Sequence, residues 1–174
     1  MLSSHVIVNA EFFSETHRLS CRVSVGPMGL VGLLNDPTKS LIEVEDVYLS
    51  RMAAPAAIVT HLERTHVNKT NLTLVLLARR EDLGPKGLAR GGFTKVLPVP
   101  ALLTTETFEV RGIVEVVTKF DASELLLGGT GRFLPVYKAA ARATHFPDTR
   151  FTGAVILVNR SLVGLIAQHS ESQD

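Results

Sequence analysis

Val67-Asn68-Lys69-Thr70 and Val158-Asn159-Arg160-Ser161 are nearly the same tetrad, and each follows one of the two tyrosines, Tyr48 and Tyr137. The tyrosines are 89 residues apart and the asparagines 91. Self-similarity at a long spacing is the mark of a repeated structural unit. The sequence therefore predicts a tandem duplication, with two residues gained in the second copy between its tyrosine and its asparagine.

An alternating stretch opens each copy. Residues 18–25 alternate between polar and apolar side chains, and residues 107–114 follow a similar pattern. Such alternation is typical of a strand with one buried and one wet face. An offset of 89 aligns the two stretches and places Arg22 on Arg111, so we expect both arginines on the wet faces of equivalent strands. The single cysteine, Cys21, falls on the apolar side, where a buried, unreactive thiol is expected.

Each tetrad lies between two apolar segments, which predicts the tight turn of a hairpin. Asparagine tolerates left-handed backbone, and its side chain bonds locally to the main chain. A short helical turn is expected at residues 121–127, after Asp121 as an N-cap, and an extended conformation at residues 139–141. About five short strands then fit into each copy, a density typical of a small barrel or sandwich.

The predicted fold is all-β: two tandem small β-barrel repeats, related by duplication and packed together. Residues 1–84 form the first repeat, residues 85–94 a Gly/Pro-rich basic linker, and residues 95–174 the second repeat. Glycine and proline at that density mark an exposed connection. We expect Val6–Ala78 and Val96–Ala167 to superpose, with Tyr48 on Tyr137 and Asn68 on Asn159.

The composition sets outer limits. The 174 residues are 45% hydrophobic and 20% charged, which excludes disordered and fibrous classes. The apolar runs are too short for a membrane-spanning helix, and no secretory signal is visible, so a cytoplasmic location without membrane association is expected. The 18 basic residues nearly balance the 17 acidic ones, so no broad positive field attracts polyanions.

Candidate contacts to an anionic ligand are six basic residues: Arg22, Arg111, Arg79, Arg80, Lys86 and Arg90. The first two would be related by the repeat, and the other four belong to a basic stretch between the copies. No acid, base and nucleophile can be assembled from the sequence, so an enzyme is not expected, and no catalytic, cofactor or metal residue is assigned. His61 and His66 are five apart, a spacing that does not suit a helical zinc site.

The second copy resembles an uncharacterised group of small bacterial proteins that carry one such unit. The resemblance rests on four segments: FEVRGIVEVV, DASELLL, RFLPVYKAA and ILVNRSLVGLIA. It covers about 60 residues of the second copy, and the first copy departs from the pattern between Gly26 and Ile42. It implies a compact β-barrel of the Sm or SH3 type and carries no functional residue with it.

Two functions of different classes follow. The first is a non-enzymatic binding or scaffold protein, whose duplicated barrels offer loops and strand edges to a protein or a small anionic ligand, with a homo-oligomer through strand edges as a further expectation. The alternative is an Sm-like nucleic-acid-binding protein, in which Arg22, Arg111 and the basic linker contact phosphates. The balanced charge and the scarcity of aromatic residues favour the first.

Overall fold

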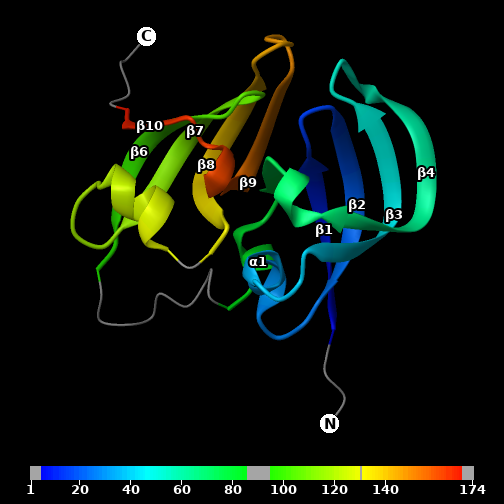
Figure 1. Cartoon of the computed structure of the whole chain (residues 1–174), viewed down its shortest axis with the longest axis horizontal. Helices are drawn as coiled ribbons and strands as arrows, with labels where there is room; N and C mark the ends of the chain where they lie inside the picture. Colours follow the sequence, from blue (N-terminus) through cyan, green and yellow to red (C-terminus); the bar gives the residue numbers. More distant parts are fainter. Residues whose placement is uncertain (1–4, 86–94, 130, 170–174) are drawn as a thin grey trace.

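The computed structural model describes residues 5–85, 95–129 and 131–169. Their strands form one antiparallel sheet in the order β10-β6-β7-β8-β9-β5-β1-β2-β3-β4 (Figure 1). The strands are β1 (Val6–Phe13), β2 (His17–Val25), β3 (Leu41–Arg51), β4 (Ala54–Asn68), β5 (Leu74–Leu77), β6 (Leu97–Thr104), β7 (Phe108–Val116), β8 (Phe133–Ala143), β9 (Arg150–Asn159) and β10 (Leu165–Gln168). The all-β prediction is confirmed.

Short helical segments lie between some of the strands. They are α1 (Gly29–Asn35), the 3-10 turns η1 (Lys69–Asn71), η2 (Arg80–Leu83) and η4 (Arg160–Leu162), and the π-helical turn η3 (Glu124–Gly128). The turn expected at residues 121–127 is present in part as η3, and the Asp121 carboxylate accepts a hydrogen bond from the Glu124 N–H. Residues 139–141 are extended, as expected. Helix α1 was not predicted from the sequence.

The N-terminal half (β1–β5) and the C-terminal half (β6–β10) have the same strand order. In the first, β5 pairs with β1, followed by β2, β3 and β4; in the second, β10 pairs with β6, followed by β7, β8 and β9. The first hairpins also match in detail, because the Ser14 hydroxyl accepts from the His17 N–H at 3.1 Å and the Thr105 hydroxyl from the Phe108 N–H at 3.0 Å. Positions in these hairpins therefore correspond at an offset of 91.

This register corrects the expected pairing of Arg22 with Arg111. Arg111 corresponds to Ser20, since Ser20 pairs with Tyr48 and Arg111 with Ala140. The alignment made from the sequence was two residues out of register. A slip of two leaves every side chain on its face of the strand, so the polar and apolar alternation could not reveal the error.

The expected match of Tyr48 with Tyr137 is also wrong. Tyr48 corresponds to Ala140, and Tyr137 to Glu45, which lies opposite Arg22 as Tyr137 lies opposite Ile113. The two tyrosines even differ in environment, because Tyr48 is 41% exposed and Tyr137 only 5%. The third strand of each half has one residue with positive φ, Asp46 at 50° and Lys138 at 48°, beside a bulge that shifts the alternation.

The halves join through β5 and β9, which pair from Leu74 opposite Val158 to Leu77 opposite Val155. Both strands are buried on both faces along this paired segment. Val75 and Leu77 contribute to a core with α1, β1, β2 and β3, whereas Leu74 and Leu76 contribute to a second core with β6, β7 and β8. Alternate side chains of one strand point to opposite faces, so the two cores lie on opposite sides of the sheet at this junction.

The tetrads do not form the hairpin turns expected from the sequence. Each asparagine caps a 3-10 turn instead: Asn68 Oδ1 accepts from the Thr70 N–H, and Asn159 Oδ1 from the Ser161 N–H. The strands on either side of each turn are not paired, because β5 pairs with β1 and β9, and β10 pairs with β6. These equivalent caps are consistent with the expected match of Asn68 with Asn159.

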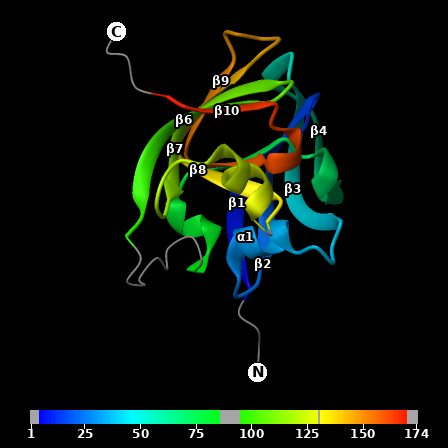
Figure 2. The ribbon, with the colours of Figure 1, turned by 60° about the vertical axis from the view of Figure 1, so that its left-hand side comes forward.

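Helix α1 lies at one end of the molecule, where it contacts β2, η2 and the second half's β8 (Figure 2). Its last residue, Asn35, links the halves, since the Asn35 Oδ1 accepts a hydrogen bond from the Phe133 N–H at 2.9 Å. Its first residue, Gly29, crosses the backbone of Gly84 so closely that a Cβ on Gly29 would lie 2.4 Å from the Gly84 Cα. The unexpected helix therefore packs on the N-terminal half and also contacts the C-terminal half.

Candidate functional site

Two of the six expected anion contacts are engaged within the protein. Arg79 forms a salt bridge with Asp82 at 2.7 Å, and this hydrogen bond raises the pKa of the arginine. Arg80 donates to Glu115 at 3.0 Å and lies 4.0 Å from the ring centre of Tyr137. These contacts give both guanidinium groups an internal structural role. Lys86 and Arg90 lie outside the described residues.

Arg22 lines a shallow hollow on the N-terminal half that also includes Glu11, Asp46 and Tyr48. The residue opposite it on β3 is Glu45. The carboxylates of Glu11, Asp46 and Glu45 pair with Arg18, His61 and Arg64, respectively. The charges around Arg22 therefore nearly balance, which gives an anion little net attraction. The structure places Arg111 in a different hollow on the C-terminal half, so the two arginines do not form a shared site.

Arg111 belongs to a group of three arginines on the outer face of β7, β8 and β9. Arg142 pairs directly with Glu109 on β7 and with Arg150 on β9. Arg111 is two residues after Glu109 on β7 and lies opposite Ala140 on β8. Residues two apart on a strand share a face, so the three guanidinium groups project from the same side of the sheet. We call Arg111, Arg142 and Arg150 the arginine cluster.

The arginine cluster surrounds a shallow hollow of about 230 Å³, which Glu109, Ala140 and Ala141 complete. The alanines have no side chain beyond Cβ, so they leave room between the longer side chains on the neighbouring strands. All three arginines are exposed, and the hollow opens to solvent. A group the size of a phosphate or sulfate fits such a space and could contact more than one guanidinium.

The electrostatics of the cluster are unbalanced. Arg142 and Arg150 are directly opposite one another, and like charges at such positions destabilise a sheet. Among the described residues, the salt bridges involve none of the three arginines. Glu109 contributes one negative charge against three positive ones, and Arg111 has the His169 ring at 3.4 Å. The hollow therefore has an excess of positive charge that an anion would neutralise.

The sequence identified Arg111 and missed Arg142 and Arg150. Arg142 follows three alanines in what was expected to be an extended segment, and strand alternation would have placed it on the same face as Ala140. Its neighbour Arg150 comes from the next strand, eight residues later. No spacing rule connects these two residues with Arg111, because the register of three strands decides which side chains meet.

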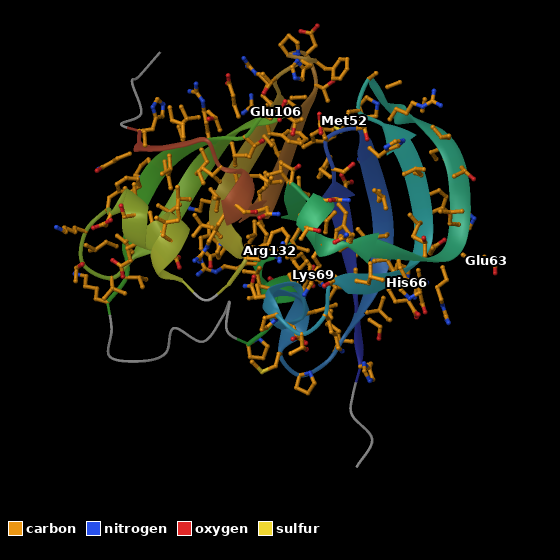
Figure 3. The ribbon with its side chains drawn as sticks, viewed as in Figure 1. Met52, Glu63, His66, Lys69, Glu106 and Arg132 are labelled. Carbon is orange, nitrogen blue, oxygen red and sulfur yellow. The ribbon has the colours of Figure 1, made fainter. Side chains whose placement is uncertain are left out.

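Two further cations, Lys69 and Arg160, lie beside the segments that follow the second strand of each half. Lys69 lies beside α1, and Arg160 lies beside η3. The buried Lys69 ammonium donates to the Leu33 carbonyl at 3.2 Å and to the Asp36 carbonyl at 2.6 Å, at the end of α1. Figure 3 shows it near Arg132, and burial lowers the pKa of Lys69. At the corresponding position, Arg160 has a buried Nε and Nη1 without a hydrogen-bond partner among the described residues. The Lys69 ammonium thereby binds the end of α1 from beneath, whereas Arg160 lines a separate hollow that also includes Glu115 and Tyr137.

Other features considered in the sequence have structural partners. His61 contacts Asp46 at 2.8 Å and His66 contacts Glu43 at 3.6 Å, so the two histidines lie with different carboxylates. Cys21 is buried, as expected, and burial raises the pKa of its thiol to about 12. Within the described ranges, no helix has the length and apolar character needed to cross a membrane.

The structure brings Arg111 together with Arg142 and Arg150 and leaves Arg22, Arg79 and Arg80 elsewhere. Comparison of the chain with protein-family models, with curated proteins and with solved structures found no match.

Proposed function

We propose that this protein is a non-enzymatic binding protein whose ligand carries a small anionic group, and that the arginine cluster holds this group. The observation that carries the proposal is the direct opposition of Arg142 and Arg150 across two strands, beside an alanine-floored hollow. An arrangement that costs stability in the free protein is expected where it provides binding.

The ligand class follows from the chemistry of arginine. A guanidinium group presents several N–H donors in a planar fork that matches the oxygens of phosphate, sulfate and carboxylate. Three such groups around one hollow favour a multiply charged oxyanion over a single carboxylate. The cluster is exposed and solvent screens it, so the affinity for a free inorganic anion is modest.

The proposed architecture has three parts: tandem duplication of one unit, closure of each unit as a small barrel of the Sm or SH3 type, and the domain boundaries expected from the sequence. The shared strand order, the matched first hairpins and the two asparagine-capped turns support the duplication. A scaffold of this kind presents its outer strand faces and edges to partners, and a cytoplasmic location remains part of the proposal.

Nucleic acid is the alternative ligand, and the geometry gives it less support. That reading combines Arg22, Arg111 and the basic linker, but Arg22 lies among carboxylates in another hollow. Arg79 and Arg80 are already paired with Asp82 and Glu115. A nucleic-acid track needs a row of free cations along the backbone path.

The first prediction is that the protein binds inorganic pyrophosphate at low ionic strength through the arginine cluster. The substitution Arg150→Gln is expected to weaken this binding at least about 3-fold, because a charge-assisted hydrogen bond is lost from a partly screened site. The same substitution should raise the free energy of unfolding of the ligand-free protein by roughly 0.2–1 kcal/mol, because the repulsion from Arg142 disappears. Isothermal titration calorimetry and denaturant unfolding measure the two effects.

Arg22→Gln is the matched control, because it makes the same chemical change at an exposed arginine of another hollow. Equal loss of pyrophosphate binding in both variants would contradict the assignment, since it would indicate general attraction to positive charge. Tight, salt-sensitive binding of single-stranded RNA that survives Arg150→Gln would instead favour the nucleic-acid alternative.

A further inference from the structure

Within the part of the chain that the structure describes, two strands of the sheet have a neighbour on one side only. β4 pairs with β3, and β10 pairs with β6, so these strands form the edges of the sheet. They lie at opposite sides of the molecule (Figure 1), which prevents them from pairing within one chain. An open edge presents unpaired N–H and C=O groups and is a template for pairing with another chain.

The junction between the halves shows how this sheet joins its own units. There the fifth strand of one half, β5, pairs with the fourth strand of the other, β9. Asn159 forms two hydrogen bonds at one end of the junction. Its backbone N–H donates to the Thr73 carbonyl at 3.0 Å, and its side-chain Nδ2 donates to the Leu72 carbonyl at 2.8 Å. The two free edges are β4, the fourth strand of the N-terminal half, and β10, the fifth strand of the C-terminal half. β4 therefore corresponds to β9, and β10 corresponds to β5.

Asn68 is the counterpart of Asn159 at the end of β4, and its side chain adopts the same local arrangement. Its Oδ1 accepts from the Thr70 N–H and hydroxyl, as that of Asn159 accepts from the N–H and hydroxyl of Ser161. Asn159 is fully buried and its amide donates across the junction, whereas Asn68 is exposed and its amide has no acceptor among the described residues. The two side-chain oxygens therefore have equivalent local partners, whereas the amide of Asn159 also has an acceptor on a neighbouring segment.

We propose that β10 of a second copy of this chain pairs antiparallel with β4, in the register that joins β5 to β9. Leu165 of the second copy would lie opposite Val67, and Ala167 opposite Thr65, each 91 residues from its counterpart in the internal pairing. Asn68 would donate to the carbonyls of Val163 and Gly164 of the second copy, the counterparts of Leu72 and Thr73. The proposal is independent of the anion site.

The side chains make this contact weaker than the internal junction. Val155 and Leu157 of β9 are buried, and their counterparts on β4 are Arg64 and His66, which pair with glutamates of β3. Figure 3 shows His66 and Glu63 on the outer part of β4. Charged residues on an edge oppose tight pairing, so the association is reversible and depends on concentration. Its two surfaces differ, so it repeats head to tail, as a ring or an open chain.

The test is disulfide trapping between two variants of the full chain, Thr65→Cys and Ala167→Cys. Residues directly opposite on antiparallel strands have Cβ atoms about 4.5–5.5 Å apart, close enough for a disulfide to form with small adjustments. The native thiol does not interfere, because Cys21 is buried and its pKa is raised to about 12. Under mild oxidation, the mixture is expected to yield the mixed disulfide in excess over either homodimer.

Each other outcome of the trapping has a defined meaning. A mixture of Thr65→Cys with Gln168→Cys should give a several-fold lower yield of the mixed disulfide. A shift of one residue along β10 turns the thiol to the other face of the sheet. Predominance of the Thr65→Cys homodimer would overturn the proposal in favour of two β4 strands pairing with each other. Equal yields from all three variants, or none from the mixture, would also overturn it.

Sedimentation velocity with Asn68→Asp provides an independent measurement. Aspartate keeps the oxygen that caps η1 but lacks the amide donors, so the dissociation constant of self-association should rise about 5-fold or more. Asn9→Asp is the control, since it makes the same chemical change at an exposed position on β1, away from both edges. An equal effect of the two substitutions, or no self-association of the unmodified chain, would contradict the proposal.

Discussion

Replacing Phe13 with alanine is expected to destabilise the whole chain by about 3–5 kcal/mol, the usual cost of removing a buried phenylalanine. Phe13 ends β1 of the N-terminal half and is only 1% exposed. Its ring packs into the core of the C-terminal half, at 5.7 Å from Phe108 in an edge-on arrangement and at 4.6 Å from Phe151. The substitution removes contacts that hold the two halves together, and these aromatic pairs add to the simple loss of buried area.

Chemical denaturation followed by circular dichroism measures this effect. Each half is small and shares its core residues with the other, so we expect one transition in the unmodified protein and in Phe13→Ala. Phe146→Ala is the control, because Phe146 lies in the turn between β8 and β9 and is 39% exposed. A loss below 1 kcal/mol for Phe13→Ala, or separate transitions in the unmodified protein, would show that the halves are stable independently.

The second large effect is expected at the crossing of two backbone segments beside α1. Gly29 has φ of 69°, a conformation that costs an L-residue about 1–2 kcal/mol. A Cβ at this position would also lie 2.4 Å from the Gly84 Cα and 2.5 Å from the Leu83 carbonyl oxygen. Backbone atoms cannot move aside as a flexible side chain can, so Gly29→Ala should separate α1 from η2. We expect a destabilisation of about 2–5 kcal/mol, the sum of the conformational and overpacking costs.

Gly26→Ala serves as the control, because a Cβ on Gly26 would meet nothing within 4 Å. Where the backbone suits alanine, this replacement leaves stability unchanged or raises it by up to about 1 kcal/mol through the unfolded state. Thermal unfolding of the two variants should therefore differ strongly, although both make the same chemical change three residues apart. Similar melting temperatures would mean that the close crossing of Gly29 and Gly84 is not a constraint on the fold.

The candidate site and the proposed edge contact are separable by experiment. The arginine cluster lies on the outer face of β7, β8 and β9, whereas the edge contact uses β4 and β10. Arg150→Gln should therefore leave disulfide trapping unchanged, and Asn68→Asp should leave pyrophosphate binding unchanged. Loss of both properties in either variant would indicate damage to the fold.

Patterns local to the sequence predicted the all-β class and the likeness of the two asparagine turns, but not helix α1. The alternation of polar and apolar residues predicted the strands, because side chains of a strand point to opposite faces whatever its neighbours are. The matched tetrads predicted the correspondence of Asn68 and Asn159, since an asparagine cap depends only on the residues beside it. The burial of Cys21 followed from the same alternation.

Only the tertiary structure decided the register and the site. A slip of two residues preserves the faces of a strand, so local alternation could not distinguish the pairing of Arg111 with Arg22 from its correspondence with Ser20. The apolar runs of β5 and β9 did not indicate that they pair with each other, because burial on both faces has no directional pattern. Arg142 and Arg150 join Arg111 through hydrogen bonds between three strands, and such long-range pairing is a property of the whole sheet.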